Sequence, residues 1–255
     1  MNEREERPDE TLTDFGYERV PWRQKKDRVR GVFDSVARRY DLMNDTMSFG
    51  MHRLWKRFTL MRTGLKPGRH ALDVAAGSGD LAAGMHRQIV PGGRLVVSDI
   101  NAAMLSVGRD RLIDAGIADG VDYVQADAEA LPFAERSFHC VAIGFGLRNV
   151  TDKRAALASM FRVLKPGGRL LVLEFSKLVL PLLEPAYDLY SFEVLPRLGA
   201  WLANDADSYR YLAESIRRHP DQRALLQLMQ QCGFERCTYY NLSAGIVALH
   251  VGYRL

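Results

Sequence analysis

Glycines and an acidic side chain follow two apolar runs at a spacing suited to an adenosine-containing cofactor. Gly77, Ser78 and Gly79 come shortly after the apolar run that ends at Val74. Glycine at such a turn permits positive φ angles and lets the backbone approach a ligand closely. Asp99 ends the next apolar run, about 20 residues later, where a carboxylate can accept hydrogen bonds from both ribose hydroxyls. The spacing therefore predicts a cofactor site where two parallel strands end.

Two kinds of cofactor fit this pattern. Residues 77–82 also match the G-x-G-x-x-A fingerprint of dinucleotide-binding proteins, so a hydride-transferring dehydrogenase is one alternative. Three features favour a methyl donor instead. The chain ends in a predicted antiparallel hairpin, Asp127-Ala128 resembles the segment that touches adenine in methyltransferases, and no Tyr-x-x-x-Lys hydride-transfer arrangement is evident. S-adenosylmethionine is therefore the favoured cofactor.

The elements that must position these residues alternate between strand and helix. Strands are expected at 70–74, 94–99, 121–125, 138–144 and 169–175, and helices at 80–89, 102–115 and 152–164. Such alternation predicts a doubly wound parallel sheet with helices on both faces. Two further helices, at 208–218 and 221–232, precede strands at 235–242 and 246–254, which indicate the terminal antiparallel hairpin.

The regions outside this alternation suggest a division of the chain. Residues 1–22 lack periodicity and are expected to form a flexible arm, and residues 23–66 a helical lid. The catalytic domain would then span 67–255 and include a substrate lid, an insertion at 177–206. An apolar stripe along 24–40 has basic residues on its other side, which predicts either a solvated helix face or weak contact with an anionic membrane surface.

Composition excludes several classes of protein. The chain has 255 residues, 47% hydrophobic and 26% charged, which suits a soluble globular domain. Its 3 cysteines form no CxxC pair, so we expect a reducing, cytoplasmic setting and no metal site. No run reaches the roughly 18 apolar residues that span a bilayer. The net charge of +4 is mild, the basic residues crowd one predicted helix, and no RNA-binding appendage is visible, so we expect no nucleic-acid partner.

Two long motifs are similar to those of a known family. The first comprises Tyr40-Asp41-Leu42-Met43-Asn44 followed by Ser48, His52 and Trp55, and the second runs from Arg162 to Ser176. Segments 145–150 and 204–211 also look like family sequence. Over residues from about 20 to 255, the chain resembles the UbiE/MenG quinone-biosynthesis C-methyltransferases. It departs from their usual pattern at Ala76, Ser78 and Gly144, where members often have Gly, Thr and Ser.

The resemblance implies a Rossmann-like class I methyltransferase fold with a mostly parallel seven-stranded sheet. It also implies methylation of a ring carbon on a polyprenylated quinol, either demethylmenaquinol or 2-methoxy-6-polyprenyl-1,4-benzoquinol. Peripheral contact with the inner membrane, a quinone-biosynthesis complex and a homodimer are further expectations. A scaffold without catalysis is the non-enzymatic alternative, and the intact Gly77, Gly79, Asp99 and Arg148 speak against it.

The predicted site residues fall into three groups. The residues expected to bind the cofactor are Ala75, Gly77, Ser78, Gly79, Asp99, Ile100, Met104, Asp127, Ala128 and Gly144. Arg148 with Asn149 is expected to stabilise a quinolate or to order a water that takes its proton, since arginine itself stays charged. The alternative is that Arg148 only fixes the following helix. The residues expected to face the substrate or form its lid are Tyr40, His52, Trp55, Tyr190 and Tyr209, with His52 as a second candidate base and helix packing as the alternative.

Overall fold

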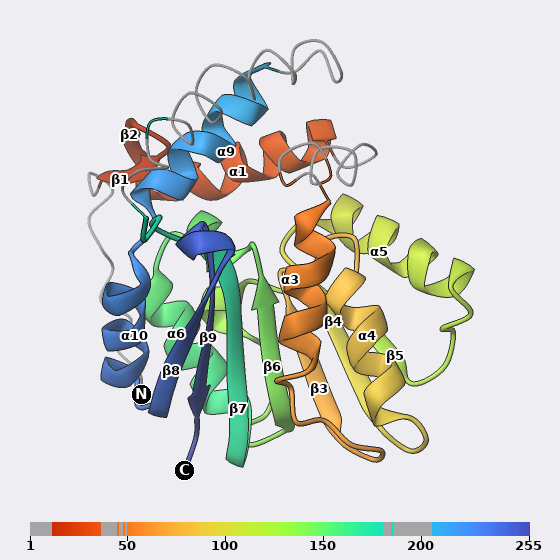
Figure 1. Ribbon diagram of the computed structural model, residues 1–255. Coiled ribbons are helices and arrows are strands. Elements are labelled where there is room, and N and C mark those ends of the chain that lie inside the picture. The colour runs from red at the N-terminus through yellow and green to blue at the C-terminus, as the bar shows by residue number, and fades with distance from the viewer. Residues whose placement is uncertain (1–11, 37–44, 46–47, 49, 181–184, 186–205) are drawn as a thin grey trace, which may run out of the picture.

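A seven-stranded sheet with the strand order β5-β4-β3-β6-β7-β9-β8 forms the centre of the molecule (Figure 1). The computed structural model describes residues 12–36, 45, 48, 50–180, 185 and 206–255. The parallel strands are β3 (His70–Val74), β4 (Arg94–Asp99), β5 (Val121–Gln125), β6 (Phe138–Gly144) and β7 (Leu164–Phe175). β9 (Val247–Tyr253) runs antiparallel to both β7 and β8 (Glu235–Leu242). The predicted fold class and terminal hairpin are therefore confirmed.

One strand is longer than its pattern indicates. β7 begins at Leu164, whereas the pattern predicts a helix up to residue 164 and a strand only from residue 169. Leu164 pairs with Phe138, and after a shift in register Arg169 pairs with Cys140. The Pro-Gly-Gly sequence thus makes an irregularity within the strand instead of ending it.

Helices cover both faces of the sheet. On one face, α6 (Lys153–Val163) and α10 (Gln222–Gln231) pack on side chains such as Leu72 and Val172. On the other, α3 (Met51–Leu60), α4 (Asp80–Ile89) and α5 (Ala102–Asp114) pack on Ala71 and Leu171. The strand alternation that puts residues 71 and 72 on opposite faces thus builds two apolar layers. The α5, α6 and α10 starts are fixed by capping side chains, namely Asn101, Asp152 and Asp221.

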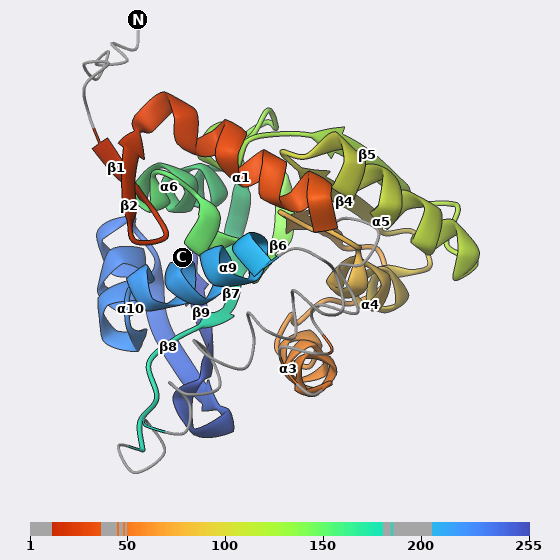
Figure 2. The same ribbon diagram turned by 90° about the horizontal axis from the view of Figure 1, so that it is seen from above.

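The carboxyl edge of the parallel strands is covered by segments from both ends of the chain. α1 (Trp22–Val36) and α9 (Ala206–Arg218) lie over this edge, as the view from above shows (Figure 2). Beneath them, the short helical turn η3 (Leu147–Asn149) follows β6. Any molecule bound at the ends of the strands is therefore enclosed by α1 and α9.

The flexible arm predicted for residues 1–22 is wrong for residues 12–21. β1 (Leu12–Phe15) and β2 (Glu18–Pro21) form an antiparallel hairpin beside α1 and α9. The Phe15 ring stacks on Tyr211 at 4.3 Å, and the Tyr17 amide donates to Glu214 at 2.9 Å. Both partners lie about 200 residues away in sequence. The hairpin therefore depends on contacts that the local sequence pattern cannot predict.

Several predicted features fall outside the described residues. They include Tyr40, Tyr190 and most of the substrate lid expected at 177–206, and for Tyr209 only the backbone within α9 is described. Within the described part of the chain, no helix is long and apolar enough to cross a membrane. No group of His, Cys, Asp and Glu side chains in the same part could hold a metal ion.

Candidate functional site

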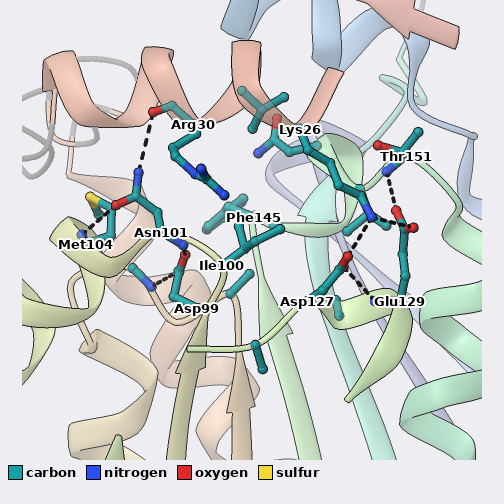
Figure 3. Close-up of a pocket in the computed structure, with 18 residues that line it drawn as sticks. Lys26, Arg30, Asp99, Ile100, Asn101, Met104, Asp127, Glu129, Phe145 and Thr151 are labelled. Atoms are coloured by element: carbon teal, nitrogen blue, oxygen red, sulfur yellow. Dashed lines mark hydrogen bonds and ion pairs between the residues drawn. The ribbon is translucent and has the colours of Figure 1, made fainter. Parts of the chain in front are cut away.

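A cavity opens at the carboxyl ends of the parallel strands, beneath α1 (Figure 3). It contains about 770 Å³ of space, including the part open to solvent, which is the size range of small-molecule sites. Most of the predicted cofactor residues line it, namely Ala75, Gly77, Asp99, Ile100, Met104, Asp127 and Ala128. Residues from four different strand ends thus meet in one place, which we call the main cavity.

Asp99 ties the glycine turn to the neighbouring strand. Its two carboxyl oxygens accept hydrogen bonds from the Gly77 and Asn101 amides, each at 2.9 Å. Burial raises the pKa of this carboxyl, and the backbone N–H groups work against the shift. Because a carboxylate has about four acceptor positions, two remain for a ligand's hydroxyl groups.

The turn itself depends on left-handed backbone and on close packing. Ala75, Gly77 and Gly79 have φ angles of 51°, 53° and 81°. Gly108 of α5 packs against the turn so closely that an added Cβ would lie 2.6 Å from the Gly77 carbonyl oxygen. Ala76, where glycine was the family expectation, lies outside the left-handed region and its methyl packs against the core around α4. The turn therefore accepts this departure.

A smaller cavity continues the site towards α3. It shares Ala75 and Phe145 with the main cavity, and its lining includes the predicted residues Ser78 and Gly144. Gly79 lines neither cavity; it caps the start of α4. The site is thus elongated, running from Asp127 along the strand ends to Gly144.

Asp73 is the functional candidate that sequence reasoning missed. Its carboxyl lines the smaller cavity, is fully buried and has no hydrogen-bond partner among the described residues. Burial raises its pKa to about 7, while Lys56 and the nearby Ala82 amide weaken the effect. The sequence did contain a signal for it, since Asp73 is an acidic residue inside the apolar run 70–74. Charged groups are seldom buried without a partner, so such a residue indicates a binding site.

α1 closes the main cavity from above. Lys26 forms ion pairs with Asp127 at 2.5 Å and Glu129 at 2.9 Å, and the side-chain amide of Asn101 donates to the Arg30 carbonyl at 3.4 Å (Figure 3). Burial favours a lower pKa for Lys26, but its hydrogen bonds to the two carboxylates outweigh burial and raise it. Sequence reasoning identified neither Lys26 nor Asn101 as a site residue, and the helical lid over 23–66 stays a prediction.

The structure separates the predicted catalytic pair. Asn149 lines the main cavity and accepts a hydrogen bond from the Tyr211 hydroxyl at 3.1 Å. Arg148 instead faces a different cavity, is 6% exposed and pairs with Glu174 at 2.9 Å. Its guanidinium also donates to the Phe145 carbonyl. These side-chain contacts fix the turn after β6 and do not reach the start of the following helix, which was the alternative, and the catalytic role of Arg148 stays a prediction.

His52 and Trp55 lie on the buried face of α3, outside the lining of the described cavities. His52 shares a hydrogen bond of 2.8 Å with Asp45, and its pKa is lowered mainly by burial. Trp55 donates to the Ser243 hydroxyl at 2.9 Å and contacts the Phe145 ring, with centroids 6.1 Å apart. Trp55 therefore touches the site only through Phe145.

Solved structures share this fold. A SAM-dependent methyltransferase from Thermotoga maritima is 20% identical, with a TM-score of 0.61 over 88% of this chain and 99% of that one. The geranyl diphosphate C-methyltransferase of Streptomyces coelicolor, solved with S-adenosyl-L-homocysteine, is 16% identical, with a TM-score of 0.57 over 78% of each chain. At such identities the likeness concerns the fold alone, which is that of SAM-dependent methyltransferases.

Sequence relatives are much closer. Proteins from Salmonella paratyphi B and Salmonella newport, both named ubiquinone/menaquinone biosynthesis C-methyltransferase UbiE, are 59% identical over 95% of this chain and 96% of their own. The model of the ubiE/COQ5 methyltransferase family matches residues 22–254. These matches confirm the resemblance and set aside the dehydrogenase alternative. The chain belongs to the ubiE/COQ5 methyltransferase family.

Proposed function

We propose that this chain transfers the methyl group of S-adenosylmethionine to a ring carbon of a polyprenylated quinol. The acceptor would be demethylmenaquinol, 2-methoxy-6-polyprenyl-1,4-benzoquinol or both. The observation that carries the proposal is the 59% identity to C-methyltransferases of ubiquinone and menaquinone biosynthesis over 95% of the chain. A cofactor-sized cavity at the strand ends supports it.

The described residues fit S-adenosylmethionine along the length of the elongated site. Asp99 has acceptor capacity for ribose hydroxyls, and Ile100 and Met104 offer apolar contact for an adenine ring. At the other end, the partnerless carboxyl of Asp73 would hold the α-ammonium group, with Lys56 beside it for the carboxylate. A cation at this position would offset the free-energy cost of burying the Asp73 carboxylate.

The cofactor supplies an activated methyl group on a sulfonium, so the chain's main task is alignment of the acceptor carbon. A ring carbon becomes a better nucleophile when the neighbouring hydroxyl loses its proton. Such a hydroxyl titrates near pH 10, by analogy with tyrosine. The chain must therefore stabilise an anionic ring oxygen at neutral pH. Arg148 would contribute its fixed positive charge to this stabilisation.

The Phe145 ring gives the site an apolar surface, and the rings of Trp55 and Phe175 pack against it. The centroids of the three rings lie 4.9–6.3 Å apart, and Phe145 lines both cavities of the cofactor site. An isoprenoid tail needs such a surface. Tyr40, Tyr190 and Tyr209 remain predicted substrate contacts.

Peripheral binding to the inner membrane is part of the proposal, because the acceptor's tail partitions into lipid. The exposed basic residues of α1, including Arg28 and Arg30, would hold the enzyme weakly to anionic vesicles. Binding measured by vesicle sedimentation should fall as salt rises. Vesicle binding that does not respond to salt would contradict an electrostatic contact.

A methyl-transfer assay tests the function. Labelled S-adenosylmethionine is supplied with short-chain versions of the two reduced acceptors, and the products are separated and counted. Label on either quinol supports the proposal and shows which pathway is served. Cofactor binding without transfer to either acceptor would favour the scaffold alternative.

A further inference from the structure

A second cavity of about 480 Å³ lies between the β1–β2 hairpin, α1, η3 and α9. Its charged lining consists of Lys25, Arg148, Lys153 and Arg218 against a single carboxylate, that of Asp14. We call it the cationic cavity. Arg148 is paired with Glu174 and Arg218 is exposed, so the buried charge that calls for an anion is that of Lys25 and Lys153.

Lys25 and Lys153 form no ion pair with any described residue. Burial lowers the pKa of Lys153, and the carboxylates of Glu174, Asp14, Asp152 and Glu129 oppose this shift from a greater distance. Lys25 is 4% exposed, and its Nζ reaches only the Val150 carbonyl at 3.5 Å. The Nζ of Lys153 reaches the same carbonyl at 3.3 Å and that of Arg148 at 3.4 Å. Neither lysine has a carboxylate within 4.0 Å among the described residues. Main-chain carbonyls at these distances only partly replace the water lost on burial.

Other polar atoms of the cavity residues are also without partners. The Thr151 hydroxyl and the Arg148 Nε are buried and make no hydrogen bond within the described structure. Together with the two ammonium groups, they make a set rich in donors, which suits an anionic oxygen. Burial lowers the pKa of Lys25 to about 8, Lys153 lowers it further, and Asp14 and Glu129 oppose the shift. An amine with that pKa is mostly protonated at pH 7, and its smaller neutral fraction can accept a proton.

The cationic cavity adjoins the cofactor site. Thr151 lines both the main cavity and the cationic cavity. Two pairs of consecutive residues divide between the two cavities. Lys25 faces the cationic cavity and Lys26 the main one, and likewise Arg148 faces the cationic cavity and Asn149 the main one. An acceptor ring beside η3 could therefore reach both.

We propose that the cationic cavity is the oxyanion site for the acceptor, in which Lys25 takes the proton of the ring hydroxyl and Lys153 and Arg148 hold the resulting oxygen. This inference rests on the proposed function. The O–H bond breaks and an N–H bond forms on neutral Lys25. The oxygen's electron pair moves into the ring, the ortho carbon bonds the methyl, and the carbon–sulfur bond breaks with its electrons on sulfur. The ring carbon then releases its proton to solvent and the ring regains aromaticity.

A coloured phenol tests the site without turnover. 4-Nitrophenol absorbs visible light only as its phenolate, so its absorbance reports the protonation state of the bound molecule. Wild type should bind it as phenolate below the pH at which it ionises in water. Lys25→Met and Lys153→Met should lose this shift, and Lys66→Met, the same change at an exposed lysine, should keep it. A bound nitrophenol that titrates as it does in water would overturn the proposal.

Inorganic phosphate separates a general anion site from a phenolate site. If phosphate binds the wild type in a Lys25-dependent manner and nitrophenol does not become phenolate, the cavity takes small anions and the proposal fails. Competition between the two for one site, with phenolate preferred, supports it. Phenolate binding by a protein that methylates no quinol would overturn the proposed function and the choice of ligand together.

Turnover provides the second readout. Lys25→Met should lower kcat by about 10²-fold, the usual effect of losing a positioned proton acceptor. Binding of S-adenosylhomocysteine should stay at the wild-type level, which also shows that the variant folds. Lys25→Arg keeps the charge and removes the base, so it should hold nitrophenolate yet turn over slowly. Wild-type kcat in either variant would overturn the role of Lys25.

Discussion

Arg148 and Glu174 form an ion pair that lies almost wholly inside the fold. Their side chains are 4% and 2% exposed, and Glu174 also accepts the Arg148 amide at 3.1 Å. A buried pair gives little net stability when intact, but removal of one partner leaves an uncompensated charge. The residue that sequence reasoning assigned to catalysis therefore also holds the turn after β6 in place.

Glu174→Gln should lower the free energy of unfolding by about 3–5 kcal/mol, because the guanidinium of Arg148 loses its counter-ion inside the protein. Denaturant unfolding measures the loss. Glu18→Gln breaks the exposed Glu18–Arg28 pair and serves as the matched control, with a change of under about 1 kcal/mol. Equal effects of the two substitutions would contradict the buried charge.

Asp73 couples cofactor binding to pH. Its pKa of about 7 in the folded protein lies above the ordinary 3.8. At low pH the buried carboxyl is protonated and uncharged, so its burial costs least there. The free energy of unfolding therefore falls as pH rises through 7. A bound ammonium favours the carboxylate and reverses this preference. S-adenosylhomocysteine should therefore bind more tightly at pH 8 than at pH 6 and release a proton near pH 7.

Titration calorimetry in two buffers of different ionisation enthalpy measures this proton release. Asp73→Asn should remove the buffer dependence and stabilise the unliganded protein at pH 8. The same heat in both buffers with the wild type would show that Asp73 does not meet a cation.

The contact between α5 and the glycine turn is the packing on which the cofactor site depends most directly. Gly108→Ala would place a Cβ 2.6 Å from the Gly77 carbonyl oxygen, a backbone atom that cannot move without distorting the turn. We expect about tenfold weaker binding of S-adenosylhomocysteine and a loss of about 1–3 kcal/mol in stability. Calorimetric titration and thermal unfolding measure the two effects.

Gly31→Ala is the matched control on α1. An added Cβ there meets nothing within 4 Å, so the better helix propensity of alanine should raise stability by up to about 1 kcal/mol. We therefore expect Gly108→Ala to lower the free energy of unfolding and Gly31→Ala to raise it. A stabilising effect of Gly108→Ala would show that α5 does not press on the turn.

Lys26 connects α1 to Asp127 and Glu129 across the cofactor site, so Lys26→Met should let the helix open more often. The pair is about one third exposed on the lysine side, which limits the expected effect to a few-fold faster release of S-adenosylhomocysteine. Stopped-flow displacement measures the rate. An unchanged rate would mean that α1 does not gate the cofactor.

The local sequence pattern predicts the buried strands but not the features that depend on contacts between distant parts of the chain. The buried strands β3, β4 and β6 show as apolar runs, because both faces of a parallel sheet are covered. The hairpin at 12–21 and the cationic cavity instead arise from contacts such as Lys25 with Val150, 125 residues apart. The separation of Arg148 from Asn149 likewise depends on side-chain direction within η3, which spacing does not determine.

At the scale of the whole molecule, the cofactor site and the cationic cavity share one edge of the sheet, with α1 covering the former and α9 lining the latter. The chain places carboxylates where a cofactor's hydroxyl and ammonium groups would bind, and lysines where an acceptor's oxygen would. This division of charge suits transfer of the methyl group to the ring carbon next to an oxygen. The oxygen itself would be held as an anion by the lysines and would not be methylated.

The position of the transferred methyl group therefore tests the central claim most directly. S-adenosylmethionine carrying a ¹³C methyl group is incubated with a reduced demethylnaphthoquinol, and the product is examined by NMR. The expected result is a labelled methyl bonded to the ring carbon beside a hydroxyl. A labelled methoxy group, or no labelled product from a protein that binds the cofactor, would contradict it.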